Sequence, residues 1–267
     1  MSTATAQAPI GATPRTGPSL LGLILLHAKF SVLETIRTPI AVVGNLLFPT
    51  LAMLFFVVPN SAVAGNPLFA TAAVGQLAMF SVMSTFLFTF GSGVAEDRAL
   101  PFDGYVRTLP AGAAPRMLGR VLAGCLFALV SLIPLGVVGA LLTEATAPPA
   151  TVVLAALMVL VVGLPFLMLG LAIGYRMSSK AAIAVVQAVL FPLAFAGGLF
   201  LPAEMFPSWL NTLSQALPSR AGRDLLIQVL TGQPAYALAL PVLIAWGLLF
   251  TALAVLAYRR DEGRRFN

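Results

Sequence analysis

The chain has 267 residues, of which 59% are hydrophobic and 9% are charged, and its net charge is +6. A soluble domain carries about 25% charged residues, so this composition predicts an all-α integral membrane protein. With one cysteine, Cys125, and one histidine, His27, the chain has no intrachain disulfide and no zinc site built from cysteine and histidine.

The N-terminal region predicts a tail followed by a helix on the membrane surface. Residues 1–18 are polar and rich in Ala, Thr and Pro, which is typical of a disordered tail. Residues 19–38 are too charged to span a bilayer and too apolar to lie free in water, so we expect an amphipathic interfacial helix. Its charged or titratable side chains are His27, Lys29, Glu34 and Arg37.

Six apolar segments follow, each near the length of about 20 residues that one transmembrane helix needs. The first two share one charge-free run, which prolines, asparagines and glycines divide near residues 59–67. The six predicted spans are 39–58, 68–93, 119–142, 151–174, 181–201 and 236–258.

Two patterns within the spans suggest contacts. In the second span, Met79, Met83, Phe86 and Phe90 fall on one helix face, which predicts either a path for an apolar substrate or a packing surface. The fourth span ends in Gly170-x-x-x-Gly174, a spacing that permits close approach of another helix.

Residues 202–235 break the spanning pattern between the fifth and sixth spans. Three prolines, Pro202, Pro207 and Pro218, divide this segment, and its charges prevent it from crossing. We therefore expect a pair of short helices that are extracellular or re-entrant.

The distribution of basic residues predicts the orientation. With six spans, both termini lie on one side, and of the 15 Lys and Arg residues all but Arg220 and Arg223 fall on that side. Basic residues concentrate in cytoplasmic loops, so both termini, including the basic tail 259–267, are expected in the cytoplasm.

The segment 94–120 concentrates charge between two apolar spans. A charge at the bilayer centre costs about 2.5–3.5 kcal/mol, so the segment must lie in water or among headgroups. It could be a solvated connector or a docking surface, and we favour docking. Its charged residues are Glu96, Asp97, Arg98, Asp103, Arg107, Arg116 and Arg120.

The chain has no evident energy source of its own. No predicted span holds a charged residue at its middle, and neither Lys29 nor Lys180 follows a glycine as a phosphate-binding loop requires. We expect no catalytic residue, no metal site and no cofactor on this chain. The alternatives are a membrane-embedded enzyme that uses interfacial carboxylates and arginines, or a passive channel or scaffold.

Two segments resemble the ABC transporter type-2 permeases, the six-span membrane subunits of bacterial ATP-driven exporters. The family's Glu-Arg-Glu-x-Gly-Thr run reads Glu-Asp-Arg-Ala-Leu-Pro-Phe-Asp-Gly here, which is an insertion within the docking segment. The matching residues are Glu96, Arg98, Gly104, Pro110, Gly119 and Arg120 in 95–124, and Gly198, Pro202, Pro207, Trp209, Pro218 and Arg223 in 196–226.

The resemblance implies a single permease domain, 19–258, in the bacterial plasma (inner) membrane. It pairs with a second copy or a similar permease and binds a separate ATPase subunit, which holds ATP and Mg. Membrane lipids are further partners, nucleic acid is not, and the exported substrate is a hydrophobic drug, a lipid or a lipid-linked molecule. The implied coupling contact to the ATPase is Glu96, Asp97, Arg98, Gly104, Arg107, Pro110 and Arg116, beside the interfacial helix, and the implied extracellular gate is Pro202, Glu204, Pro207, Trp209 and Arg223.

Overall fold

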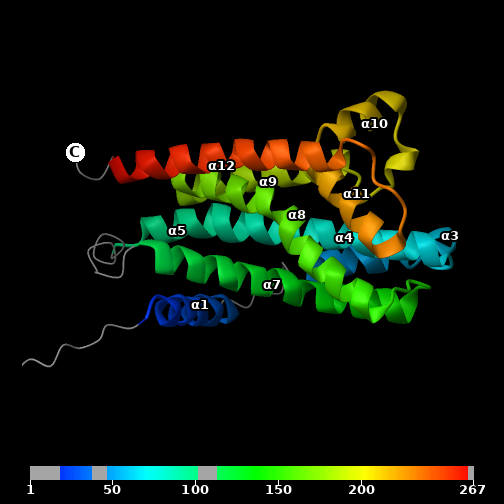
Figure 1. Cartoon of the computed structure of the whole chain (residues 1–267), viewed down its shortest axis with the longest axis horizontal. Coiled ribbons are helices and arrows are strands. Elements are labelled where there is room, and N and C mark those ends of the chain that lie inside the picture. The colour runs from blue at the N-terminus through cyan, green and yellow to red at the C-terminus, as the bar shows by residue number, and fades with distance from the viewer. Residues whose placement is uncertain (1–18, 38–46, 102–112, 264–267) are drawn as a thin grey trace, which may run out of the picture.

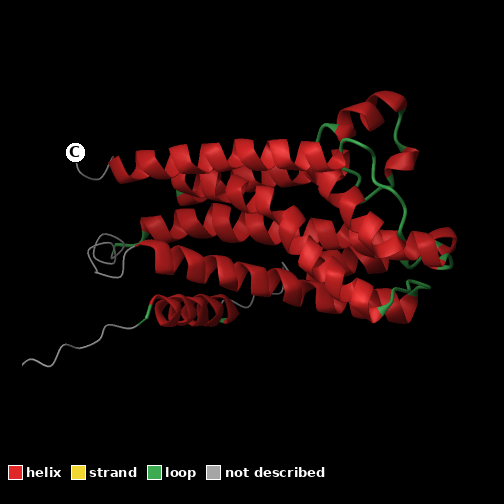
Figure 2. Ribbon diagram, viewed as in Figure 1, coloured by secondary structure: helices red, strands yellow, loops and turns green. Residues whose placement is uncertain are grey.

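The described part of the chain is helical. The computed structural model describes residues 19–37, 47–101 and 113–263, and these contain helices and loops but no strand (Figure 2). The all-α prediction is therefore confirmed for the described residues. The expected tail 1–18, residues 38–46, the residues Gly104, Arg107 and Pro110, and the end of the basic tail lie outside the described residues.

Five helices are long and apolar enough to cross a membrane. The first, Pro67–Ala99, is continuous through α4 (Pro67–Phe86), the π-helix η2 (Leu87–Ser92) and α5 (Gly93–Ala99). These five confirm the predicted spans two to six as apolar helices. The other four are α7 (Ala113–Leu142), α8 (Pro149–Arg176), α9 (Ser179–Ala196) and α12 (Ala239–Gly263).

The first predicted span, 39–58, is only partly within the described residues. Its described portion is a shorter apolar helix, Leu47–Val57, which ends in the π-helix η1 (Met53–Val57). A short turn, α3 (Ser61–Ala64), then leads to α4. Asn66 begins α4 by accepting hydrogen bonds from the amides of Leu68 and Phe69 at 3.0 and 3.2 Å, which satisfies donors that the first turn leaves free.

The long helices lie side by side, and the shorter elements gather at their ends (Figure 1). The C-terminal end of α12, α5 and α1 (Leu20–Ile36) lie toward one end of the body. At the other end lie α3, the turn η3 (Ala203–Met205), α10 (Ser208–Gln215) and α11 (Pro218–Thr231). Helix α1 packs against α7 and is foreshortened in Figure 1, so its axis is inclined to those of the long helices.

The second span forms the centre of the core. Within its most apolar stretch 83% is buried, against 22–39% for the other four candidate spans. Helices α7, α8 and α11 pack against α4, and α8 and α9 pack against η2. The other four long helices therefore leave a larger share of their side chains exposed than the second span does.

Close packing of α8 on this central helix depends on glycine. A Cβ at Gly170 would lie 2.9 Å from the Phe86 carbonyl oxygen, and a Cβ at Gly174 would lie 2.9 Å from the Gly91 carbonyl oxygen and closer still to that of Phe90. The expected close approach at Gly170-x-x-x-Gly174 is thus confirmed, and its partner is the π-helical turn η2.

Candidate functional site: charged clusters at the two ends of the body

Two residues of α5 tie the predicted docking segment to different spans. Arg98 pairs with Asp261 of α12, and its Nη1 donates to the carbonyl oxygens of Gly174 at 2.7 Å and Met177 at 3.2 Å. Asp97 pairs with Arg120 of α7. The α5 segment is therefore held on one side by α7 and on the other by α8 and α12.

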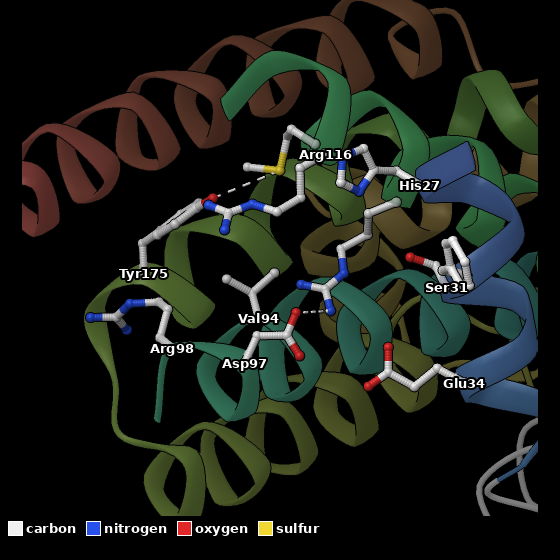
Figure 3. Close-up of a pocket in the computed structure, with 11 residues that line it drawn as sticks. His27, Ser31, Glu34, Val94, Asp97, Arg98, Arg116 and Tyr175 are labelled. Carbon is white, nitrogen blue, oxygen red and sulfur yellow. Dashed lines mark hydrogen bonds and ion pairs between the residues drawn. The ribbon is translucent and has the colours of Figure 1, made fainter. Parts of the chain in front are cut away.

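A cavity of about 190 Å³ opens beside these pairs, between α1, α5, α7 and α8. Figure 3 shows side chains from all four helices directed toward it. The cavity brings together members of two predicted sets, the interfacial helix and the coupling contact. Its polar lining residues are His27, Ser31, Glu34, Asp97, Arg98, Arg116, Arg120 and Tyr175.

Other predicted members of these sets do not line the cavity. Glu96 lies exposed on α5, Lys29 lies exposed on α1, and Arg37 lies exposed directly after α1 ends. Conversely, Ser31, Arg120, Tyr175 and Asp261 contribute to this end of the protein although the predicted site did not include them.

Helix α1 can pack closely against α7 and line the cavity because α7 has a glycine, Gly119, at the contact. A Cβ at Gly119 would lie 2.6 Å from the Cβ of His27 and 2.8 Å from the amide nitrogen of Ala28. Backbone atoms cannot move aside as a flexible side chain can, so the two helices approach closely only because residue 119 lacks a side chain.

Replacing Gly119 with alanine is therefore expected to push α1 away from α7. We expect a loss of roughly 1–2 kcal/mol in the free energy of unfolding, as for overpacked helix contacts. Thermal unfolding of the purified protein in lipid nanodiscs measures it. Gly136→Ala on the same helix is the control, since a Cβ there meets nothing within 4 Å, and an equal loss in both variants would contradict the steric explanation.

The opposite end of the body holds a buried charge cluster on α11. Asp224 accepts hydrogen bonds from Arg220 and from Arg223, each at 2.7 Å, and only 3% of Arg223 is exposed. With the Gln76 amide oxygen facing Arg223, that oxygen accepts from Arg223 Nε at 3.2 Å. Burial lowers the pKa of the Arg223 guanidinium, and the Asp224 carboxylate opposes this shift.

The predicted gate residues occupy two different environments. Glu204 and Pro207 are exposed, and Trp209 on α10 is 67% exposed. Arg223 is instead buried, and its Nη2 lies 3.8 Å from a carboxylate oxygen of Glu204 in the exposed segment. The pair of short helices expected in 202–235 is present as α10 and α11, although α11 is buried along much of its length.

The loop after α11 is fixed to the end of α10. Tyr236 donates a hydrogen bond to the Gln215 carbonyl oxygen at 2.7 Å. Burial raises the pKa of Tyr236 to about 12, so its hydroxyl keeps the proton that it donates at neutral pH. Trp246 of α12 donates to the next carbonyl, that of Ala216, at 2.8 Å.

The predicted substrate-path residues form the centre of the core. Met79, Met83, Phe86 and Phe90 each have 0% exposure, and the Phe86 and Phe90 rings meet edge to face at 5.8 Å between centroids. In this conformation they pack against other helices, so a substrate would reach them only if a neighbouring helix moved away from the second span.

The described residues offer no obvious cofactor chemistry. Among them, no group of three or more His, Cys, Asp or Glu side chains could hold a metal ion. The charged groups that are brought together form ion pairs instead, between helices at the α5 end and within α11 at the other end. This arrangement is suited to transmitting movement between elements.

Long apolar helices with ion-paired charges at both ends define a multi-pass membrane protein. Residues 23–231 match the family described as ABC-2 type transporter, so the chain belongs to that family. Its members are membrane permease domains that lack ATPase activity themselves and pair with ATPase subunits. The family resemblance seen in the sequence motifs is thereby confirmed.

The chain is also similar to a curated bacterial protein. It is 25% identical over 231 residues to the "Putative transport permease YvfS" of Bacillus subtilis (strain 168). The match covers 86% of this chain and 94% of the relative, so it spans nearly the whole of both proteins.

Proposed function

We propose that this chain is the membrane subunit of an ATP-driven exporter and that its ATPase partner docks at the α5 end of the body. The observation that carries the proposal is the fixing of α5 to three spans through Arg98 and Asp97. A subunit that pushes on α5 would act on α7, α8 and α12 together. Members of this family pair with ATPase subunits, so the expected partner is an ATPase.

The proposed topology has six spans and both termini in the cytoplasm. The bias of basic residues supports this orientation. In the proposed topology the Leu47–Val57 helix is part of the first span, and α1 lies in the interface of the cytoplasmic leaflet. The position of α1 is supported by its exposed apolar side chains, which include Leu25, Leu26 and Phe30.

The proposed assembly contains two permeases, either two copies of this chain or this chain with a similar one. The proposed cargo is a hydrophobic drug, a lipid or a lipid-linked molecule, and the support for it is the apolar character of the span surfaces. In this proposal, the exposed segment with Glu204, Pro207 and Trp209 forms the outer gate, which the buried Arg223 anchors.

Purification of the tagged chain from its native membrane in a mild detergent tests the proposal. We expect a soluble ATPase with a phosphate-binding loop to remain bound in near-equal amount, as mass spectrometry would show. A second permease in the same eluate would distinguish a heterodimer from a homodimer. Recovery of the chain alone, even after chemical crosslinking, would contradict the exporter proposal and favour a membrane enzyme.

A further inference from the structure

Arg98 joins three chain segments that are far apart in sequence. From α5 its Nε donates to Asp261 Oδ1 at 3.1 Å, near the end of α12, across 163 positions of the chain. Its Nη1 donates to the carbonyl oxygens of Gly174 and Met177, where α8 ends and the turn to α9 begins. The guanidinium carbon also lies 6.0 Å from the centre of the Tyr175 ring.

The contact is shielded and geometrically fixed. Only 4% of the Asp261 side chain and 19% of the Arg98 side chain are exposed, so water screens this pair less than it screens a surface ion pair. The guanidinium is a planar fork, and acceptors from two segments fix its orientation. A lysine could not satisfy the same three acceptors in this geometry.

Arg98 thereby holds a pair of helices rather than a single loop. Helices α8 and α12 pack against each other, and the Tyr175 and Tyr258 rings meet edge to face at 5.1 Å. At the far end of the body α11 packs on both helices. A displacement of the Arg98 contact would therefore move α8 and α12 as one unit and reach the buried cluster on α11.

The other ion pair of α5 does not reach this unit. Asp97 pairs with Arg120 of α7, and 42% of its side chain is exposed. The two adjacent residues thus connect α5 to opposite sides, and Arg98 makes the more buried of the two contacts.

We propose that Arg98, with Asp261 as its partner, is the positioning residue that transmits displacement of α5 to the α8–α12 pair. The inference rests on the proposed function, because the docked ATPase is the source of that displacement. It assigns the end of α12 to the coupling apparatus, although the sequence predicts these residues as a basic tail. The movement of α8 and α12 during transport would then be driven through a contact that is shielded within the protein.

The test measures movement at the outer end of the body, which needs no knowledge of the substrate. Spin labels are placed at Leu240→Cys on α12 and Leu141→Cys on α7, which are 53% and 76% exposed, after Cys125→Ala removes the native thiol. The complex with its co-purified ATPase is placed in nanodiscs, and the distance is measured without nucleotide and with ATP and vanadate. Dilution with unlabelled permease isolates distances within one subunit.

The labelled protein with Arg98 and Asp261 intact is expected to change its distance distribution when nucleotide is trapped. In Asp261→Asn the ATPase is expected to stay bound. The ratio of the populations at the two label distances, the one without nucleotide and the one with ATP and vanadate, is expected to change roughly tenfold less on nucleotide trapping, which is within the usual range of coupling between sites. Combining Arg98→Gln with Asp261→Asn is expected to cause no greater loss than either change alone, since both act through one contact.

A matched control separates positioning from stability. Ser131→Ala removes the buried hydrogen bond between Ser81 and Ser131, 2.6 Å long, which lies in the body and not at α5. It is expected to lower the unfolding temperature while it preserves the movement. Loss of the movement in Ser131→Ala to the same extent as in Asp261→Asn would overturn the inference, because stability alone would then explain both variants.

The remaining outcomes distinguish the inference from the function on which it rests. If the ATPase binds and Asp261→Asn moves as the intact protein does, the inference is overturned and the exporter proposal stands. If the ATPase binds but nucleotide does not change the label distance in the intact protein, the inference is overturned and the exporter proposal again stands. If no ATPase is recovered, the exporter proposal fails and the inference fails with it.

Discussion

Replacing Asp224 with alanine is expected to destabilise the protein more than any other single change at its outer end. Asp224 bridges Arg220 and Arg223, and the exposed fraction is below 10% for all three residues. Alanine would leave two buried guanidinium groups without their shared counterion. Removing one partner of a buried ion pair costs about 3–5 kcal/mol in the free energy of unfolding.

Thermal unfolding in nanodiscs measures this effect, with a thiol-reactive dye reporting exposure of Cys125, the one cysteine of the chain. Glu204→Gln is the matched control, because it removes a carboxylate that is 72% exposed and 3.8 Å from the same Arg223. An exposed pair contributes about 0–1 kcal/mol, so this variant should unfold near the unaltered protein. Equal losses in the two variants would show that Asp224 does not neutralise the cluster.

The spans could be predicted from sequence because the requirement that produces them is local. A helix in hydrocarbon needs about 20 apolar residues in a row, and composition alone reveals such a run. The close contact at Gly170-x-x-x-Gly174 was also predictable as a possibility, but its partner was not. The π-helical turn η2 that it meets has no sequence pattern of its own that marks it.

The contacts between the charged residues were not predictable in the same way. Asp261 lies 163 positions from Arg98, and its neighbours in sequence are mostly basic and typical of a solvated tail. Composition places such a residue outside the apolar core, and only the fold brings it against α5. Arg98 is shielded by other helices of the protein, because Asp261 of α12 and the end of α8 lie against its side chain.

The cluster on α11 shows the same limit and one overlooked pattern. Arg220 and Asp224 stand four positions apart, a spacing that places opposite charges together on one helix face. That spacing could have predicted the pair, but not its burial. The sequence predicted a pair of short helices that are extracellular or re-entrant, and in the structure α4, α8 and α12 pack against α11, with Arg223 only 3% exposed.

Replacing Gly174 with valine is expected to separate α8 from the central helix. A Cβ there would lie 2.9 Å from the Gly91 carbonyl oxygen and closer to that of Phe90, and both are backbone atoms that cannot rotate away. We expect a loss of roughly 3 kcal/mol in the free energy of unfolding, at the upper end for overpacked sites. The Gly174 carbonyl also accepts from Arg98 at 2.7 Å, so a shifted α8 should also weaken the contact that holds α5.

Two measurements on the Gly174→Val variant check both parts of this expectation. Thermal unfolding gives the stability loss, and retention of the ATPase during detergent purification reports the state of α5. Gly247→Ala on α12 is the control, because a Cβ there would meet the Pro165 ring at an ordinary 3.6 Å. A Gly174→Val variant as stable as Gly247→Ala would mean that α8 and η2 do not approach closely in the membrane. A destabilised variant that still retains its ATPase would mean that α8 does not hold α5 in the docking position.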